Sequence, residues 1–126
     1  MAIKDKTILI VEDEMINIWI LKEIIIELGV EIKVAENGRV AVEMVKSNNI
    51  DLVLMDINMP VMDGLKATTE IIKFNNDIVI IAQTAFVHRK QECLDAGCSA
   101  FICKPYKKKD VHQIINKYFN ELIKDG

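Results

Sequence analysis

Residues 52–56 read LVLMD, four apolar residues followed by an acid. An uninterrupted apolar run of this length is typical of a strand that is buried on both faces, as in a parallel sheet covered by helices. Further runs of strand length lie at 8–11, 32–35, 78–81 and 100–103. The sequence therefore predicts five strands.

Segments of helical periodicity follow these runs, at about 14–28, 38–48, 64–74, 86–96 and 107–124. Turn and cap residues lie between the elements, at Gly29, Asn37-Gly38, Asp63-Gly64 and Gly97. Strand and helix alternate five times without a linker or an internal repeat. This order predicts a single α/β domain over residues 1–126, a doubly wound (βα)5 fold with helices on both faces of a parallel sheet.

The composition excludes several classes of protein. With a formal net charge of −3, the chain is not expected to have a broad nucleic-acid-binding surface. The basic run 107–109 fits a solvated helix start. Cys93, Cys98 and Cys103 lack the spacing of a zinc site or the even number of a disulfide framework, so we expect reduced, buried thiols. With no apolar run of membrane-spanning length, the expectation is a cytoplasmic protein without membrane insertion.

Polar side chains follow the predicted strands. In a doubly wound fold, functional groups gather beyond the carboxyl ends of the strands. The residues found there are Glu12, Asp13, Asp56, Thr84 and Lys104. Clustered carboxylates raise one another's pKa unless a cation joins them, and oxygen ligands of this kind suit Mg²⁺. With a lysine and a hydroxyl opposite, the set matches the needs of phosphoryl transfer to a carboxylate nucleophile, for which the central Asp56 is the candidate.

Each of these residues also has an ordinary structural interpretation. Glu12 and Asp13 could favour a helix dipole, and Asp56 could be a turn residue. Thr84 could satisfy local backbone groups, and Lys104 could be solvated. Their occurrence together, at strand ends in the right order, favours the functional interpretation.

The sequence resembles the response-regulator receiver domains of two-component phosphorelays over nearly its whole length. The motifs that carry the resemblance are ILIVEDE at 8–14, MDINMPVMDG at 55–64, QTA at 83–85 and KP at 104–105. The resemblance implies a flavodoxin-like sheet of strand order 2-1-3-4-5. It also implies a phosphoprotein that switches conformation to signal to a partner or an output domain.

By this resemblance, Asp56 accepts a phosphoryl group from a phosphohistidine and forms an aspartyl phosphate. Asp13 and Asp56 would bind the Mg²⁺ cofactor directly, with the backbone carbonyl of Asn58 as a third ligand. Glu12 would act on the metal mainly through water.

The resemblance also assigns groups to the phosphoryl oxygens. Lys104 would bridge Asp56 and the phosphoryl group, and the Thr84 hydroxyl would bind a second oxygen together with the backbone N–H groups of Asn58 and Ala85. A cis peptide bond before Pro105 would aim the lysine.

The same resemblance predicts how the switch works. Thr84 moves toward the phosphoryl group, and Phe101 turns into the vacated space; the alternative for Phe101 is an ordinary core aromatic. Asn58 and Phe86 would tune the lifetime of the phosphorylated state, Phe86 by shielding it from water.

The first helix carries a second apolar stripe opposite its core face. The core face is expected to carry Ile20, Leu21, Ile24 and Leu28. Met15, Trp19, Lys22 and Ile26 recur on the other side. Either loops of the chain cover this stripe, or Met15, Ile16 and Trp19 dock a sensor histidine kinase or a histidine phosphotransfer protein.

Other functions remain as alternatives. The expected protein is not an enzyme with an external substrate, but a signalling phosphoacceptor with self-catalysed phosphotransfer and autodephosphorylation. A haloacid-dehalogenase-like phosphatase would need an acid two residues after Asp56, where Asn58 stands. A flavodoxin-like carrier would need a phosphate loop where residues 12–14 are acidic, and a P-loop motif is missing from the sequence.

The assembly and the origin of the chain are less determined. The expected state is a monomer or a weak, phosphorylation-dependent dimer. Residues 12–17 resemble receivers of hybrid sensor histidine kinases more than those of DNA-binding regulators. The sequence leaves open whether the domain is free-standing or part of a longer protein.

Overall fold

A computed structural model describes residues 2–125 of the chain, so the two end residues of the expected 1–126 domain, Met1 and Gly126, lie outside the described residues. Five parallel strands form one sheet of order β2-β1-β3-β4-β5, which confirms the expected topology. The strands are β1 (Thr7–Val11), β2 (Glu31–Ala35), β3 (Leu52–Asp56), β4 (Val79–Thr84) and β5 (Ala100–Cys103).

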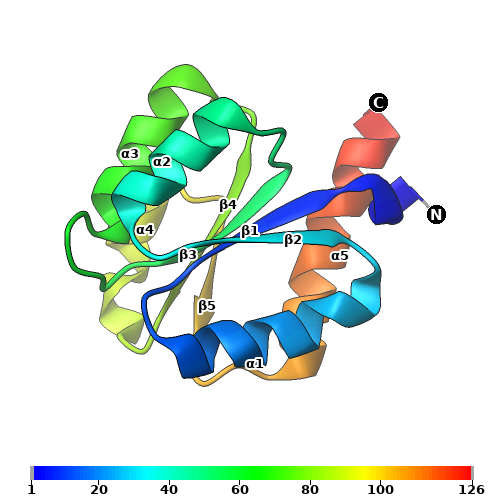
Figure 1. Ribbon diagram of the computed structural model, residues 1–126, viewed down its shortest axis with the longest axis horizontal. Helices are drawn as coiled ribbons and strands as arrows, with labels where there is room; N and C mark the ends of the chain where they lie inside the picture. The colour runs from blue at the N-terminus through cyan, green and yellow to red at the C-terminus, as the bar shows by residue number, and fades with distance from the viewer. Residues whose placement is uncertain (1, 126) are drawn as a thin grey trace.

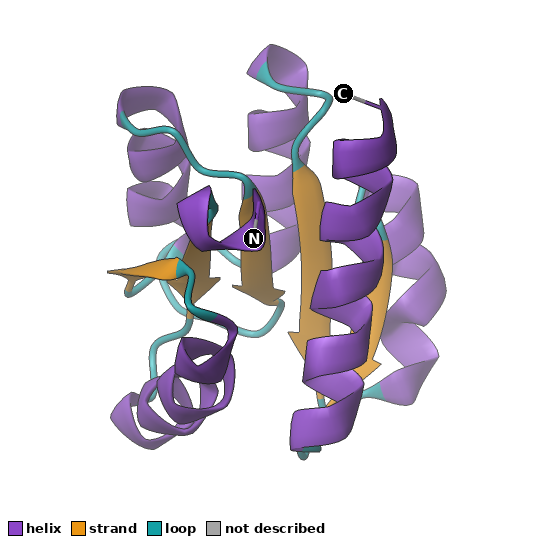
Figure 2. Ribbon diagram, turned by 90° about the vertical axis from the view of Figure 1, so that its right-hand side faces the viewer, coloured by secondary structure: helices purple, strands orange, loops and turns teal. Residues whose placement is uncertain are grey.

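Helices cover both faces of the sheet (Figure 1). They are α1 (Met15–Ile25), α2 (Gly38–Ser47), α3 (Gly64–Phe74), α4 (Lys90–Ala96) and α5 (Lys108–Asp125). In Figure 1, α2, α3 and α4 lie on one side of the sheet, and α1 and α5 lie on the other. Figure 2 shows α5, the helix that ends beside the C label, lying across the front of the strands. No helix in the described part of the chain is both long enough and apolar enough to cross a bilayer.

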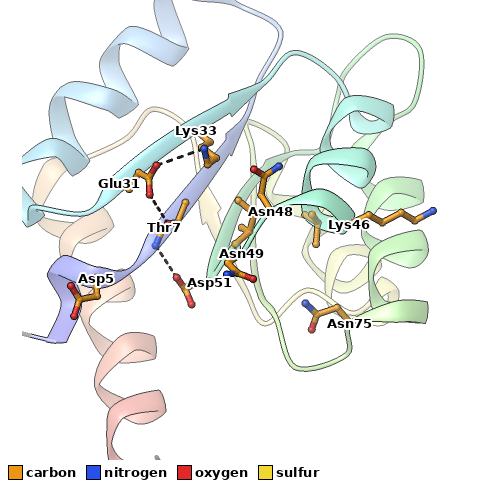
Figure 3. Close-up of a pocket in the computed structure, with 11 residues that line it drawn as sticks. Asp5, Thr7, Glu31, Lys33, Lys46, Asn48, Asn49, Asp51 and Asn75 are labelled. Carbon is orange, nitrogen blue, oxygen red and sulfur yellow. Dashed lines mark hydrogen bonds and ion pairs between the residues drawn. The ribbon is translucent and has the colours of Figure 1, made fainter.

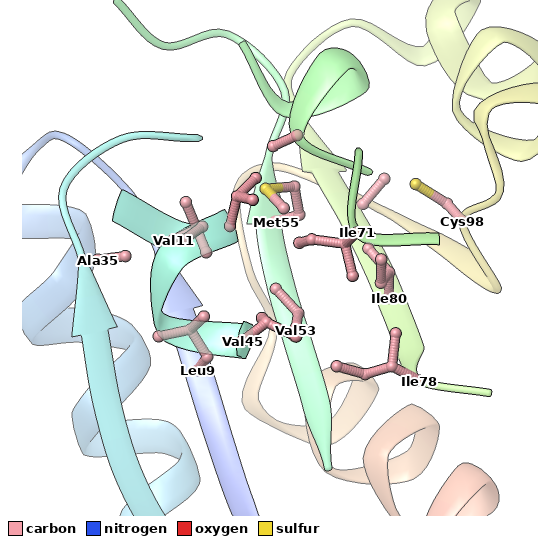
Figure 4. Close-up of a cluster of buried hydrophobic side chains, with 14 of the residues drawn as sticks. Leu9, Val11, Ala35, Val45, Val53, Met55, Ile71, Ile78, Ile80 and Cys98 are labelled. Carbon is pink, nitrogen blue, oxygen red and sulfur yellow. The ribbon is translucent and has the colours of Figure 1, made fainter. Parts of the chain in front are cut away.

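Successive residues of the three central strands point to opposite faces, which divides the core in two. One half packs against α2, α3 and α4 and is drawn in Figure 4, where side chains such as Val53, Met55 and Ile71 converge. The other half packs against α1 and α5, around side chains such as Leu54 and Phe119. Burial on both faces explains why these strands are apolar at consecutive positions.

Two expected helices are interrupted. The segment 14–28 ends its α-helix at Ile25 and continues as a 3₁₀ turn, Ile26–Leu28, before Gly29 at φ 79°. The segment 86–96 begins with an extended Phe86 and a 3₁₀ turn, Val87–Arg89, so α4 starts only at Lys90. In α1, Ile25 is fully buried while Ile20 and Leu28 of the expected core stripe are half-buried.

The fourth strand runs further than the apolar pattern predicts. It continues through Gln83 and Thr84 because Asp56 of β3 and Cys103 of β5 pair with these residues in the sheet. A strand ends where its ladder partners end, whereas an apolar run reports only which side chains are buried. Thr84 is therefore the last residue of a strand rather than part of a loop.

The expected turn residues close the helix ends. Asn37 and Asp63 cap α2 and α3 by accepting hydrogen bonds from backbone N–H groups at 2.9 Å. Gly64 follows Asp63 for a different reason: a Cβ there would lie 2.2 Å from the backbone oxygen of Asp56. The loop after β3 thus packs directly on the strand that carries the central acid.

Other expectations from composition can be placed in the same fold. The lysines at 107–109 are exposed at the start of α5, as expected for a solvated helix start. All three cysteines are free thiols, with Cys93 and Cys98 buried and Cys103 half-buried. Burial raises the pKa of Cys93, and it raises the pKa of Cys98 to about 11, which keeps these two thiols protonated and unreactive.

Candidate functional site

The carboxyl ends of the strands bring the predicted site residues to one edge of the sheet. Glu12 directly follows β1, Asp56 and Thr84 end β3 and β4, and Lys104 directly follows β5. Parallel pairing places these ends side by side, because strands β1, β3, β4 and β5 are neighbours in that order. Positions separated by up to 92 residues along the chain therefore meet in one place.

Three carboxylates form a tight cluster at this edge. One oxygen from each of Glu12, Asp13 and Asp56 lies within 4.8 Å of the others. Glu12 and Asp56 are buried, Asp56 being only 3% exposed, while Asp13 faces solvent. The cluster has the composition and spacing of a site for a hard divalent cation.

Lys104 lies against the two buried carboxylates. Its Nζ is 3.1 Å from Oε1 of Glu12 and 3.4 Å from Oδ1 of Asp56. Burial by itself lowers the pKa of Lys104, but the negative charges of Asp56 and Glu12 outweigh burial, and the pKa is raised overall. The expected partner of Lys104 was Asp56, but Glu12 is nearer.

The electrostatic balance of the cluster is unfavourable for ionised Asp56. Burial and the charge of Glu12 raise the pKa of Asp56 to about 7, although Lys104 acts in the opposite direction. Two buried acids share one ammonium group, so the site lacks positive charge. A divalent cation would supply that charge, and the carboxylate oxygens, with no histidine or thiolate among them, are of the kind that Mg²⁺ prefers.

Polar groups of Asn58, Thr84 and Phe86 form a hydrogen-bonded set next to Asp56. The Asn58 side chain donates from Nδ2 to Oγ1 of Thr84 at 3.0 Å, and the backbone N–H of Phe86 donates to the same oxygen at 3.1 Å. The backbone N–H of Asn58 lies 3.3 Å from Oδ1 of Asp56. Thr84 thus already has two hydrogen-bond donors before any phosphoryl group is present.

These groups surround a small cavity of about 230 Å³. Its lining consists of Glu14, Asn17, Asp56, Asn58, Ala85, Phe86 and Lys104. Phe86 is 50% exposed at this cavity, and Ala85 is exposed beside it. Sequence reasoning missed Asn17 and Glu14, although both belong to the turn and first helix that follow the acidic pair.

Tyr106 is a second residue that sequence reasoning missed. Its hydroxyl is buried and has no hydrogen-bond partner in the described part of the chain. Burial, together with the charges of Glu12 and Asp56, raises the pKa of this hydroxyl. Its position two residues after Lys104 was the available signal, since the backbone that aims Lys104 into the cluster also carries Tyr106 toward it.

The remaining predicted residues lie close by. The Lys104–Pro105 peptide bond is cis, as the resemblance implies. Phe101 is half-buried and packs against the core half under α2, α3 and α4, so it occupies the position of a core aromatic on the edge strand.

The second stripe of α1 is open to solvent. Met15 is 85% exposed, and Ile16 and Trp19 are each 60% exposed. Met15, Trp19 and their neighbours line a mostly apolar hollow of about 170 Å³. The alternative in which loops of the chain cover this stripe is therefore wrong for the described residues.

The sequence matches proteins of known class. The profile of the response regulator receiver domain matches residues 8–116. Hybrid signal transduction histidine kinase B of Dictyostelium discoideum is 39% identical over 133 residues, which cover 93% of this chain and 7% of that protein. Chemotaxis protein CheY of Bacillus subtilis is 39% identical over 116 residues, which cover 90% of this chain and 97% of that protein. The chain thus spans a small part of the kinase and nearly all of CheY.

Solved structures give the same result for the fold. The receiver domain of a Pseudomonas aeruginosa sensor histidine kinase, with magnesium in its active site cleft, has 31% identity and a TM-score of 0.85 over 92% of this chain and 98% of that one. The receiver domain in a complex with a histidine phosphotransfer protein of Saccharomyces cerevisiae has 29% identity and a TM-score of 0.80 over 90% and 86%.

Proposed function

The chain belongs to the response regulator receiver domain family of two-component and phosphorelay systems, and we propose that Asp56 is its phosphoryl acceptor. One observation carries this assignment. Asp56 ends the central strand and lines the small cavity. There its carboxylate is within reach of Nζ of Lys104 and of the backbone N–H of Asn58. The acceptor carboxylate is held in place by strand pairing and can be reached from solvent through the cavity.

The acidic cluster is the proposed site of Mg²⁺. Asp13 and Asp56 would bind the ion, with the Asn58 carbonyl as a third ligand, and Glu12 would act through water. When bound, the ion supplies the positive charge that the cluster lacks. Glu12 holds Lys104 at 3.1 Å and also accepts the backbone N–H of Glu14 at 3.2 Å, so its carboxylate orients the lysine while it tunes the cluster.

The proposed reaction is a transfer between two protein side chains. An oxygen of Asp56 attacks phosphorus, the bond from phosphorus to the histidine nitrogen breaks, and the aspartyl phosphate forms. Lys104, the Thr84 hydroxyl and the N–H groups of Asn58 and Ala85 would bind the phosphoryl oxygens. Attack of water on the same phosphorus would return the carboxylate, and Phe86 would slow this step by covering the cavity.

The conformational switch would begin at Thr84. A phosphoryl oxygen on Asp56 would accept the hydrogen of the Thr84 hydroxyl and draw this side chain toward Asp56. Phe101, on the neighbouring edge strand, would turn into the space that Thr84 leaves. We expect a monomer or a weak dimer that signals in the cytoplasm.

The test is phosphorylation by acetyl phosphate in the presence of Mg²⁺, followed by intact mass. The wild-type protein should gain one phosphoryl group, and Asp56→Asn should gain none. Asp51→Asn changes the same chemistry at the opposite end of β3 and should be phosphorylated like the wild type. Phosphorylation of Asp56→Asn at the wild-type rate would refute the assignment of the acceptor.

The exposed stripe of α1 is the proposed docking face for a phosphohistidine donor protein, a sensor histidine kinase or a histidine phosphotransfer protein. The stripe is apolar, it is not covered by other described residues, and it begins three residues after Glu12. This position would bring a donor histidine on a docked helix close to the acceptor cavity.

Trp19→Glu separates docking from chemistry. It should slow transfer from a histidine phosphotransfer protein by about tenfold or more, because large buried aromatics dominate interface energies. Phosphorylation by acetyl phosphate should stay within twofold of wild type. The control is Phe74→Glu, which changes an exposed aromatic at the far end of α3. Equal loss with both donors would contradict a docking role.

A further inference from the structure

Arg89 lies directly before α4 and contacts Asn58, which lines the cavity of the site. Its Nη1 donates to Oδ1 of Asn58 at 2.7 Å. Its Nε and Nη2 lie 3.0 and 2.9 Å from Oε2 of Glu92, one turn further along the chain. The guanidinium is thus held from both sides, and its side chain is only 23% exposed.

The chemistry of a guanidinium determines how Asn58 is turned. Arginine has only donors, so it binds the oxygen of the Asn58 amide and not the nitrogen. The amide nitrogen then faces Thr84, to which it donates at 3.0 Å. Arg89 therefore selects one of two amide orientations that would otherwise occupy nearly the same space.

That orientation decides what Thr84 can do. Its oxygen accepts hydrogen bonds from Asn58 and from the backbone N–H of Phe86, which occupies both lone pairs. The hydroxyl hydrogen is left for a third group. With the opposite amide orientation, the Asn58 oxygen would accept that hydrogen, and Thr84 would have no donor left for a phosphoryl oxygen.

We propose that Arg89 is a positioning residue for phosphorylation: through the Asn58 amide, it keeps the Thr84 hydroxyl hydrogen available to the phosphoryl group on Asp56. The proposal rests on the proposed function, because it needs Asp56 as acceptor. It adds a residue that lies outside the cavity lining and that no motif of the sequence singled out.

The experiment compares four proteins in phosphorylation by acetyl phosphate with Mg²⁺. Arg89→Met removes the donors and should lower the rate by about three- to tenfold, the range that one hydrogen bond contributes. Lys90→Met makes the same charge change on the neighbouring exposed residue and should stay within twofold of wild type. Arg89→Lys keeps a donor and should recover part of the loss.

Two further measurements distinguish positioning from a general structural effect. The side-chain amide signals of Asn58 in a ¹⁵N-edited spectrum should shift in Arg89→Met and not in Lys90→Met. In an Asn58→Ala background, Arg89→Met should have no additional effect on the rate, because Arg89 acts only through that amide.

Equal rates for Arg89→Met and Lys90→Met would overturn the proposal, and so would a full effect of Arg89→Met in the Asn58→Ala background. Neither result would touch the acceptor assignment. That assignment fails separately if Asp56→Asn is phosphorylated, whatever the Arg89 variants do.

Discussion

The amino ends and the carboxyl ends of the parallel strands form two opposite edges of the sheet, the amino edge and the carboxyl edge. Both edges carry acids and lysines, but the charges pair differently at each. At the amino edge, a broad hollow of about 780 Å³ contains Glu31, Lys33 and Asp51 (Figure 3). Two acids there have partners: Asp51 accepts the backbone N–H of Thr7 at 2.8 Å, and Glu31 lies 3.6 Å from Nζ of Lys33 and accepts the Thr7 hydroxyl. At the carboxyl edge, a hollow of about 230 Å³ holds buried acids that share one lysine.

This contrast indicates that unbalanced, buried charge identifies the proposed site better than the size of a hollow does. Exposed ion pairs contribute little to stability, so the amino edge is an ordinary hydrated surface. Buried acids in excess are costly unless a ligand neutralises them. The smaller hollow is thus the one for which we propose Mg²⁺ binding and phosphoryl transfer.

The largest expected effect comes from removing the lysine of each edge. Lys104→Met should lower the rate of phosphorylation by acetyl phosphate by two to three orders of magnitude, roughly the cost of losing one electrostatic stabiliser in an active site. Lys33→Met, at the amino edge, should leave the rate unchanged. The measurement is intact mass against time, with circular dichroism to show that both variants are folded. Similar rates for the two variants would remove the distinction between the edges.

The next effect concerns stability against pH in the absence of divalent ions. The pKa of Asp56 is raised to about 7 in the folded protein, above its ordinary value, so the folded state holds this proton more tightly than the unfolded state does. Its contribution to stability is present at low pH and is lost as pH rises from about 4 to about 7. The free energy of unfolding of Asp56→Asn, which cannot ionise, should therefore exceed that of the wild type by roughly 4 kcal/mol at pH 8.

Urea unfolding of both proteins between pH 5 and pH 8 would test this pH dependence. Millimolar Mg²⁺ should remove most of the advantage of Asp56→Asn at pH 8, because the ion stabilises the ionised wild-type cluster. A difference in free energy of unfolding that is constant with pH would show that Asp56 is ionised throughout this range. The cluster would then not raise the pKa of Asp56.

The smallest effect compares two glycines. Gly64→Ala should cost about 2 kcal/mol and slow phosphorylation, because the new Cβ would lie 2.2 Å from the Asp56 backbone oxygen and would push the acceptor strand. Gly29→Ala, before β2, should cost about 1 kcal/mol through its φ of 79° alone and leave phosphorylation unchanged. Urea unfolding and the acetyl phosphate assay measure both effects. Slower phosphorylation in Gly29→Ala would mean that backbone strain at the amino edge reaches the site.

Much of the fold follows from patterns that are local in the sequence. Apolar runs locate all five strands. Asn37 and Asp63 mark the starts of α2 and α3, Gly97 marks the end of α4, and Gly29 marks the end of the 3₁₀ turn that follows α1. Boundaries were less predictable where the deciding contact is distant, as in β4, whose last residues are strand only because Asp56 and Cys103 lie beside them.

The same division applies to the site. The acids at strand ends and the lysine before Pro105 could be found from their positions, because parallel topology forces strand ends together. For Tyr106 the only signal was its position two residues after Lys104. Arg89 could not be found from its position, because its proposed role depends on a hydrogen bond to Asn58, which lies 31 residues away in the chain.

Periodicity and residue type alone predict the five strands, their alternation with helices and the kinds of group that follow the strands, whereas the strand order was expected only from the resemblance to receiver domains. How the charges pair follows only from the three-dimensional packing. Hydrogen bonds and burial depend on distances of a few tenths of an ångström between residues far apart in the chain. Those distances place Lys104 on Glu12 as well as on Asp56, turn the Asn58 amide toward Thr84, and leave the Met15 and Trp19 stripe exposed.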